Sequence, residues 1–404
     1  MHPPGADTVL VRHGEVGVKS GKVQRAMERK LRKNLAAMLD DRGVAYGSVE
    51  RQWSRLLVHT TEDAVEAATD AAADAFGVVS ASPAVAVEPT QDAIEAALVV
   101  ASEAHYDDGT FAVDARRAGP AEAHPFSSHD LQRDGGQAVW DAVADRFEPA
   151  VDLDDPDVTF FVECRPETAY VFMEHRPGPG GLPLGTQGRL VALVSGGIDS
   201  PVAAWEAMKR GAELVPVYLD LGEYGGPDHE ARAVETVRTL ARYAPTADMT
   251  VRKVPAGEAV ARIVDAVEDT RMLTYRRFMY RVAEHVAAET GAHGIVTGEA
   301  IGQKSSQTTA NLAVASRATR LPIHRPLVTA DKSDITARAR EVGTYRDSTI
   351  PAGCNRIAPT YPETNATLEQ VRDAEPDALF EWAREAAENC ELVPVRERAE
   401  EATP

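Results

Sequence analysis

The spacing of apolar residues changes along the chain and divides it into two regions. At the start, an apolar run over 8–12 predicts a strand, and positions 23–40 follow a helical period. One side of that helix is apolar, at Met27, Leu31, Leu35 and Met38. Further helices are predicted over 62–76, 90–103 and 136–146, and further strands over 110–117, 158–164 and 169–174. Residues up to 174 are therefore predicted to form an α+β region.

The pattern changes after residues 177–183, a Pro- and Gly-rich segment that breaks both helix and strand. From there on, the strands are apolar without alternation and helices separate them, which is typical of a parallel sheet buried on both faces. Strands are predicted over 190–194 and 214–219, with a helix between them that stops at Gly211. The fold class is thus predicted as α/β, with a doubly wound parallel sheet preceded by α+β structure.

Composition adds limits on size and location. The 404 residues suit two or three domains, and they contain no apolar run of about 18 residues that could span a membrane. The first residues have neither a basic nor an apolar signal segment, so a cytoplasmic protein is expected. The cysteines Cys164, Cys354 and Cys390 are far apart and form no C-x-x-C pair, so no structural metal site is expected.

The charge of the chain is strongly acidic, but one segment is basic. A formal net charge of -20 at face value argues against a nucleic-acid partner. The alternative is an acidic surface of the kind that salt-loving organisms use, in which case only local charge is informative. Glu28 is the only acid between Lys19 and Leu39, a stretch with the cations Lys19, Lys22, Arg25, Arg29, Lys30, Arg32 and Lys33. From the residues alone, a solvated helix face and a phosphate-binding surface are equal interpretations.

A turn with two consecutive glycines follows the strand over 190–194, and it reads Ser195-Gly196-Gly197-Ile198-Asp199-Ser200. Glycines let backbone N–H groups approach a ligand, and the helix N-terminus that follows has unpaired donors and a positive potential. The turn is therefore expected to bind phosphate, with further donors from the two serine hydroxyls. Asp199 would repel phosphate, so it either caps the helix, places magnesium or holds the loop.

This turn is neither a Walker A loop, which ends in Gly-Lys-[Ser/Thr], nor a G-x-G-x-x-G dinucleotide turn. The string S-G-G-x-D-S after an apolar strand resembles the PP-loop of ATP pyrophosphatases, which cleave ATP to AMP and pyrophosphate. The resemblance implies that a carbonyl oxygen is adenylated and then displaced by a nucleophile.

Other segments resemble the ThiI family of tRNA 4-thiouridine synthetases over nearly the whole chain. They are Arg12-His13-Gly14-Glu15, Gly178-Pro179-Gly180-Gly181-Leu182-Pro183, Tyr275-Arg276-Arg277-Phe278-Met279, Thr297-Gly298-Glu299-Ala300-Ile301-Gly302-Gln303, Ser305-Ser306-Gln307-Thr308, Arg325-Pro326-Leu327 and Asp331-Lys332. The resemblance implies an N-terminal ferredoxin-like domain at 1–60, a THUMP RNA-binding domain at 61–174, a linker at 175–188 and a PP-loop domain at 189–404.

The resemblance also implies the ATP contacts. With Tyr218 and Leu219 flanking adenine, the predicted ATP-binding residues are Leu193, Val194, Ser195, Gly196, Gly197, Ser200, Tyr218, Leu219, Arg277, Gly298 and Gln307. Arg277 would supply a cation for phosphate, or it is a surface charge on a predicted helix over 271–289. Lys332 would stabilise an anionic transition state, or it lies in a solvated helical turn.

Cys354 lies in a Gly/Pro loop beside Arg356, which favours the thiolate. It matches the family's catalytic cysteine, which carries or receives a persulfide, whereas the residues alone equally allow an inert loop cysteine. Some family members have a C-terminal rhodanese-like domain that delivers sulfur, and the short segment after Cys354 predicts a form without it. The sulfur donor would then be a persulfide-carrying protein, free sulfide or a cysteine-bound cluster.

The expected activity is thiolation of uridine 8 in tRNA, by adenylation of uracil O4 and displacement of AMP by sulfur, with ATP and Mg²⁺ as cofactors. The catalytic residues would be Asp199, Lys332 and Cys354. The cations over 19–33, with Arg116 and Arg117, would hold the RNA by its phosphates. Sulfur transfer to a carrier protein for thiamine thiazole synthesis and a homodimer are left open. The alternative from another class is a non-catalytic RNA-binding protein.

Overall fold

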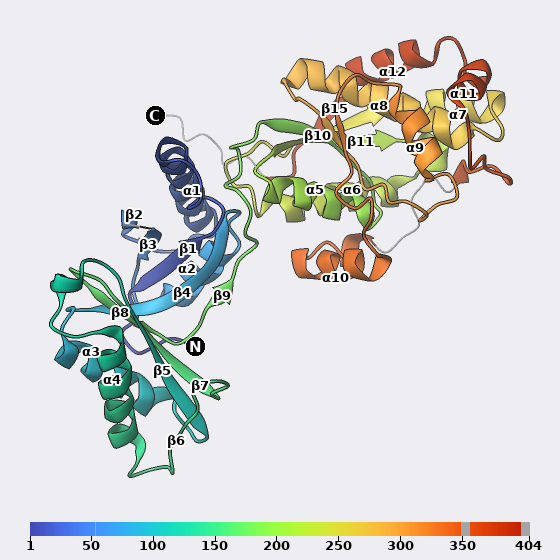
Figure 1. Ribbon diagram of the computed structural model, residues 1–404. Coiled ribbons are helices and arrows are strands. Elements are labelled where there is room, and N and C mark those ends of the chain that lie inside the picture. The colour runs from blue at the N-terminus through green and yellow to red at the C-terminus, as the bar shows by residue number, and fades with distance from the viewer. Residues whose placement is uncertain (53, 349–355, 397–404) are drawn as a thin grey trace. The chain divides into compact units, whose positions relative to one another are not determined.

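The computed structural model describes residues 1–52, 54–348 and 356–396, which form two compact units, Met1–Pro183 and Leu184–Pro404 (Figure 1). Within the described residues, no helix is both long and apolar enough to cross a lipid bilayer.

The first unit is built on one sheet in the order β2-β3-β1-β4-β8-β7-β5-β6, with β9 paired to β4. Its strands are β1 (Thr8–His13), β2 (Ser48–Gln52), β3 (Arg55–His59), β4 (Val78–Val87), β5 (Thr110–Arg117), β6 (Ala150–Val151), β7 (Val158–Cys164), β8 (Ala169–Phe172) and β9 (Arg176–Pro177). Its helices are α1 (Gly21–Asp41), α2 (Val65–Ala73), α3 (Gln91–His105), α4 (Ser128–Val143) and the short η1 (Ala121–Ala123). The long strand β4 pairs with both β1 and β8, so the sheet runs without a break across the predicted boundary at residue 60.

The alternation of side chains along the strands gives this sheet two different faces. Val9 and Val11 of β1 pack with Leu31 and Leu35 of α1, and the helices α3 and α4 cover the other half of the same face. Of the apolar stripe predicted on α1, Leu31, Leu35 and Met38 are buried, whereas Met27 is half-buried. The opposite face carries a smaller apolar cluster that strands alone contribute, including Leu10, Leu57, Ala84, Tyr170 and Phe172.

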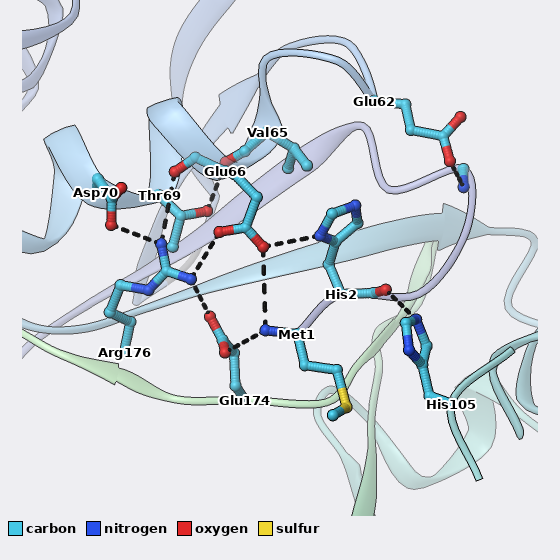
Figure 2. A network of polar contacts seen from close by, with 11 residues as sticks. Met1, His2, Glu62, Val65, Glu66, Thr69, Asp70, His105, Glu174 and Arg176 are labelled. Atoms are coloured by element: carbon cyan, nitrogen blue, oxygen red, sulfur yellow. Dashed lines mark hydrogen bonds and ion pairs between the residues drawn. The ribbon is translucent and has the colours of Figure 1, made fainter. Parts of the chain in front are cut away.

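A polar network fastens the segment after β8 to α2 (Figure 2). The Arg176 guanidinium lies 2.7 Å from both Glu66 Oε2 and Asp70 Oδ1 of α2. The amino group of Met1 lies 2.6 Å from Glu174 Oε2, and His2 Nδ1 lies 2.8 Å from Glu66 Oε1. Figure 2 shows these groups converging from three segments that are distant in the sequence. The network holds the N-terminus and the segment 174–176 against α2.

The second unit has a six-stranded sheet in the order β14-β13-β10-β11-β12-β15. Its strands are β10 (Arg189–Val194), β11 (Glu213–Asp220), β12 (Val251–Pro255), β13 (Ile295–Val296), β14 (Ile323–His324) and β15 (Glu391–Val393). Neighbouring strands are parallel except β12 and β15, so an antiparallel edge strand completes the sheet. The buried, unalternating runs predicted such a sheet, and the fold class is confirmed.

Helices cover both faces of this sheet, with α8 and α12 on one side and α5 and α6 on the other (Figure 1). They are α5 (Asp199–Lys209), α6 (Pro227–Ala241), α7 (Gly257–Ala266), α8 (Arg271–Thr290), α9 (Thr309–Ser316), α10 (Lys332–Val342), α11 (Leu368–Ala374) and α12 (Leu379–Glu388), with the short η2 (Gly222–Tyr224) and η3 (Arg346–Ser348). Because β10 is flanked by β11 and β13, the strand order reverses direction at β10. Ligands of doubly wound sheets bind beyond the carboxyl ends of the strands at such a point.

Candidate functional site

The glycine turn lies at that point, between the end of β10 and the start of α5. Its two serines bind each other: the Ser195 backbone N–H donates to Ser200 Oγ at 2.9 Å, and the hydroxyl oxygens are 3.1 Å apart. The Gly197 N–H donates to Ser195 Oγ at 3.3 Å. The serine hydroxyls therefore hold the turn closed, in addition to any donor role toward phosphate.

Gly298, in the loop after β13, permits a close approach between two backbone segments. A Cβ at this position would lie 2.6 Å from the carbonyl carbon of Asp199 and from the nitrogen of Ser200. Such contacts are far inside van der Waals distance, so any larger residue would displace the start of α5. The absence of a side chain at Gly298 therefore makes room for the glycine turn, and its predicted contact with ATP stays a prediction.

A cavity opens at the carboxyl ends of β10, β11 and β13. Ten of the eleven residues predicted to bind ATP line it: Leu193, Val194, Ser195, Gly196, Gly197, Ser200, Tyr218, Leu219, Gly298 and Gln307. Asp199 lines it as well. Segments 193–200, 218–219 and 298–307, distant in the sequence, are therefore brought to one place, and their contacts with ATP remain predictions.

Arg277 does not line this cavity. Its guanidinium is fully buried and forms two contacts with Glu375, from Nε to Oε2 at 2.6 Å and from Nη2 to Oε1 at 2.9 Å. The expected phosphate cation at Arg277 is thus corrected to a structural ion pair. Adjacent helical residues point about 100° apart, and the neighbouring Arg276 points into the cavity instead.

The sequence contained a signal for Arg276 that the prediction missed. The α8 residues that line the cavity are Met272, Tyr275, Arg276, Met279 and Tyr280. These positions repeat at intervals of three and four, as one face of a helix must. Position 277 falls off that face.

Glu299 connects Arg276 to the floor of the cavity. Its carboxylate lies 3.1 Å from Arg276 Nε and 2.8 Å from Arg325 Nε, and it accepts hydrogen bonds from Tyr280 and from Thr297. Arg276 also donates to the carbonyl and hydroxyl oxygens of Ser306. Burial, with the charge of Glu299, raises the pKa of Tyr280, so the phenol stays protonated as a donor. This Glu299 network holds the Arg276 guanidinium in one orientation at the cavity that the glycine turn also lines.

Asp199 and Lys332 are paired. Lys332 Nζ lies 2.7 Å from Asp199 Oδ1, although the residues begin two different helices, α5 and α10. Both side chains reach solvent: that of Lys332 is 54% exposed and that of Asp199 is 29% exposed. No side chain caps α5, so the carboxylate serves the ion pair and not a helix cap. Two of the three residues predicted to be catalytic are thus in contact, and Asp199 of this pair lines the cavity.

Cys354, the third predicted catalytic residue, lies outside the described residues. The chain that follows it reaches the cavity: Arg356 Nη1 donates to the carbonyl of Gly225 at 3.3 Å, and Gly225, Ala358 and Pro362 line the cavity. Burial raises the pKa of Cys164 to about 11, and burial also raises the pKa of the half-buried Cys390. Neither is suited to act as a thiolate at neutral pH.

The predicted RNA contacts all lie in the first unit. On and just before α1, six cations are exposed, and none forms an ion pair within the described residues: Lys19, Lys22, Arg25, Arg29, Arg32 and Lys33. Arg116 is 79% exposed and lies 3.5 Å from Asp114. Arg117 instead donates to the carbonyl oxygens of His124 and Phe126, so its guanidinium group bonds within the first unit.

Three family comparisons divide the chain in the same order as its structure. The family described as "Thiamine biosynthesis protein (ThiI)" matches residues 185–380. The "ThiI ferredoxin-like domain" matches 8–82, and the "THUMP domain" matches 89–174.

Curated relatives and a solved structure extend these matches over the whole chain. A protein of Halobacterium salinarum named "Probable tRNA sulfurtransferase" is 65% identical over 96% of this chain and 97% of its own length. A Methanosarcina acetivorans protein of the same name is 41% identical over 90% of this chain and 88% of its own. A crystal structure of a 4-thiouridine synthetase–RNA complex with bound ATP is 29% identical, with a TM-score of 0.83 over 96% of this chain and 99% of that one. The chain belongs to the ThiI family.

Proposed function

We propose that this protein is an ATP-dependent tRNA uracil 4-sulfurtransferase that forms 4-thiouridine at position 8 of tRNA. The observation that carries the proposal is the cavity formed by the S-G-G-x-D-S turn, with the Asp199–Lys332 pair at its edge. The relatives named for tRNA sulfur transfer, and the similar synthetase solved with RNA and ATP, support the same substrates.

ATP would lie along the carboxyl ends of the strands, with its phosphates at the glycine turn and its adenine between the segments at Leu193 and Tyr218. The turn offers backbone N–H groups at a helix N-terminus. Arg276 takes the phosphate role first expected of Arg277, because it lines the cavity and the Glu299 network orients it.

Asp199 fits a magnesium ion, which proteins hold through one or two carboxylates together with substrate phosphates. Within the described residues, no group of three or more His, Cys, Asp and Glu side chains is placed to hold a metal unaided, so the phosphates would complete the coordination. Bound there, Mg²⁺ would neutralise charge on the phosphates. Lys332 would stabilise the negative charge that develops as uracil O4 attacks the α-phosphate and pyrophosphate leaves.

Adenylation turns O4 into a good leaving group. Sulfide would then attack C4 and displace AMP. Where the sulfur is carried as a persulfide on Cys354, a second thiol would attack the Cys354 sulfur, release the outer sulfur as sulfide and leave a disulfide at Cys354. The segment after Cys354 contacts Gly225 at the cavity, which supports this assignment. A persulfide-carrying protein or free sulfide would supply the sulfur in a cytoplasmic reaction. The name of the matched family supports a link to thiamine biosynthesis, for which sulfur transfer to a carrier protein is the corresponding proposal.

The tRNA would be held by phosphate contacts from the exposed cations of α1 and from Arg116. This surface is basic within a chain of net charge -20, so it attracts RNA locally while the rest of the surface repels it.

The decisive experiment is mass spectrometry of tRNA incubated with the protein, ATP, magnesium and a sulfide source. We expect one oxygen to be replaced by sulfur at uridine 8, and only when ATP is present. The same reactions should release pyrophosphate in a tRNA-dependent way. If tRNA is bound but no pyrophosphate forms under any sulfur source, the protein is a non-catalytic RNA binder and the proposal is wrong.

A further inference from the structure

Three arginines surround one buried carboxylate on the helix-free face of the first unit's sheet. Arg165 of the β7–β8 turn donates to Glu163 Oε1 through Nε at 2.9 Å and also through Nη2. Arg12 Nη2 lies 3.4 Å from Glu163 Oε2, and Arg55 Nε lies 3.5 Å from the same oxygen. We call Glu163 and these three arginines the Glu163 cluster.

The curl of the sheet builds this cluster from distant segments. The last residue of β2 and the residue after β7 meet, because Arg165 Nη1 donates to the carbonyl of Gln52 at 3.5 Å. The hydroxyl of Tyr170 donates to the side-chain oxygen of Gln52 at 3.1 Å. The Arg12 guanidinium lies over the ring of Phe172, 4.9 Å from its centre. The side chains of Arg165 and Arg12 are therefore held by hydrogen bonding and packing as well as by charge.

The charges of the cluster do not balance. Three guanidinium groups face one carboxylate, and the four side chains are between 4% and 24% exposed. Within the described residues, Arg55 Nε is buried without a hydrogen-bond acceptor. Charge removed from water is stable when it is paired, so an excess of two cations on these buried and part-buried side chains favours binding of an anion.

Electrostatic effects on the neighbouring groups agree with this excess. Burial lowers the pKa of Arg12 to about 10. The charge of Glu163 opposes this shift, and the charges of Arg55 and Arg116 add to it. Although burial opposes it, the charges of Arg55 and Arg165 hold the pKa of Glu163 below its usual value.

We propose that Arg12, Arg55 and Arg165 bind a phosphate group of the RNA substrate, with Glu163 as the residue that positions their guanidinium groups. The inference rests on the proposed function. Planar guanidinium groups match the oxygen spacing of a phosphate, and several can share one. RNA is favoured as the source because the charge of Arg116, which is 79% exposed, acts on Arg12, and the same unit exposes six further unpaired cations on and before α1.

The alternative is that the cluster only holds the sheet in its curled form. Two substitutions separate the possibilities, because they change the charge in opposite directions. Arg55→Gln removes one cation whose contact with Glu163 is long, so it should leave folding intact. Glu163→Gln removes the only carboxylate, which should weaken the fold but leave an even larger positive excess for an anion.

The experiment measures tRNA binding without ATP over a series of salt concentrations. For Arg55→Gln we expect roughly 10-fold weaker binding and a slope of log K against log salt reduced by about one. Glu163→Gln should bind at least as tightly as the natural protein. The matched control is Arg133→Gln, which also removes one arginine from this unit, at an exposed pair with Asp134, and should leave the slope unchanged.

A second measurement separates RNA phosphate from free phosphate. Inorganic phosphate should raise the melting temperature of the natural protein and of Arg55→Gln equally, since both keep the glycine turn intact. A larger rise in the natural protein, with an unchanged tRNA slope for Arg55→Gln, would make this a free-anion site and overturn the RNA assignment. A loss of tRNA binding in Glu163→Gln that parallels its loss of stability would leave only the structural role.

The outcome is separate from that of the proposed function. If the natural protein binds tRNA with the expected dependence on Arg55 but never thiolates it, the phosphate site stands and the proposed activity fails. If the natural protein thiolates tRNA while Arg55→Gln keeps the full salt dependence of tRNA binding, the proposed phosphate site is wrong and the proposed activity stands.

Discussion

Lys332 Nζ lies 2.7 Å from Asp199 Oδ1, across 133 residues of sequence, and each residue opens a helix. Helix N-termini carry positive potential, so two of them and an ammonium group converge near one carboxylate. These positive groups offset the charge of the carboxylate, so Asp199 repels an incoming phosphate less strongly than an isolated acid would. The pair resolves the problem that an acid poses inside a phosphate-binding turn.

Asp199→Asn should lower the rate of tRNA-dependent pyrophosphate release on the order of 100-fold or more, because the carboxylate is lost where the phosphate charge must be organised. Lys332→Gln should lower the rate similarly, and the double variant should cost little beyond either single change, since the two act as a unit. The measurement is pyrophosphate release alongside tRNA binding, which should stay within about twofold.

Glu206→Gln is the matched control for this pair. Glu206 also joins α5 to α10, through Arg338 Nε at 3.3 Å, but it does not line the cavity. Full activity in Glu206→Gln would show that losing an α5–α10 ion pair is not enough to stop the reaction. An equal loss of activity in this variant would mean that the pairs act only by packing the two helices.

Gly298→Ala should lower turnover on the order of 100-fold, because the added methyl group would stand 2.6 Å from the backbone of Asp199 and Ser200. The displaced element is the phosphate-binding turn, so the loss should appear in ATP binding and in turnover together. The free energy of unfolding should fall by about 1–3 kcal/mol, as it usually does when a packed site is overfilled. Unchanged kinetics in a stable variant would show that the turn tolerates the shift.

Glu299→Gln should raise the KM for ATP about 10-fold, or about 1.4 kcal/mol, because Arg276 would lose its carboxylate partner while the shape of the site is kept. Arg276→Gln should raise the KM by at least as much, and the double variant should add little. Glu284→Gln serves as the control, since Glu284 pairs with Arg281 on the same helix outside the cavity. An effect on kcat alone, with KM unchanged, would contradict a positioning role toward ATP.

The sequence allowed the fold and most of the cavity to be predicted because local patterns determine them. The apolar run 190–194 and its glycine turn form one strand–turn–helix unit, which needs no distant residue to be recognised. The position of Arg277 was predicted from family resemblance alone, and the helical period of the cavity-lining residues would have favoured Arg276. A one-residue difference on a helix changes which side of it a guanidinium occupies.

The Glu163 cluster and the Glu299 network could not be predicted in the same way. Arg12, Arg55 and Arg165 lie on three segments, and only the curl of the sheet brings them to Glu163. Pairing of Glu299 with Arg325 likewise depends on parallel strands whose order is not written in any local pattern. Long-range ion pairs of this kind depend on tertiary geometry, whereas turns and amphipathic helices depend on neighbours in the chain.

The three cysteines should differ sharply in reactivity toward iodoacetamide in the native protein at pH 8. Alkylation requires the thiolate, and burial raises the pKa of Cys164 to about 11, so on the order of one thiol in a thousand is ionised there. Its side chain is also fully buried. Cys164 should therefore stay unmodified, Cys390 should react slowly, and Cys354, beside Arg356 in the sequence, should react first. Peptide mapping by mass spectrometry measures all three at once.

The effects of substituting these cysteines on thiolation should match their reactivities. Cys354→Ser should abolish turnover with a persulfide donor, whereas Cys164→Ala should retain thiolation and lose only about 1–3 kcal/mol of stability, as a small core cavity does. Raising the pH toward 11 should speed labelling of Cys164, because ionisation of a buried thiol destabilises the folded state and exposes the thiolate. Full activity of Cys354→Ser with a persulfide donor would exclude Cys354 as the sulfur carrier. Rapid labelling of Cys164 at pH 8 would contradict the raised pKa and the burial of that thiol.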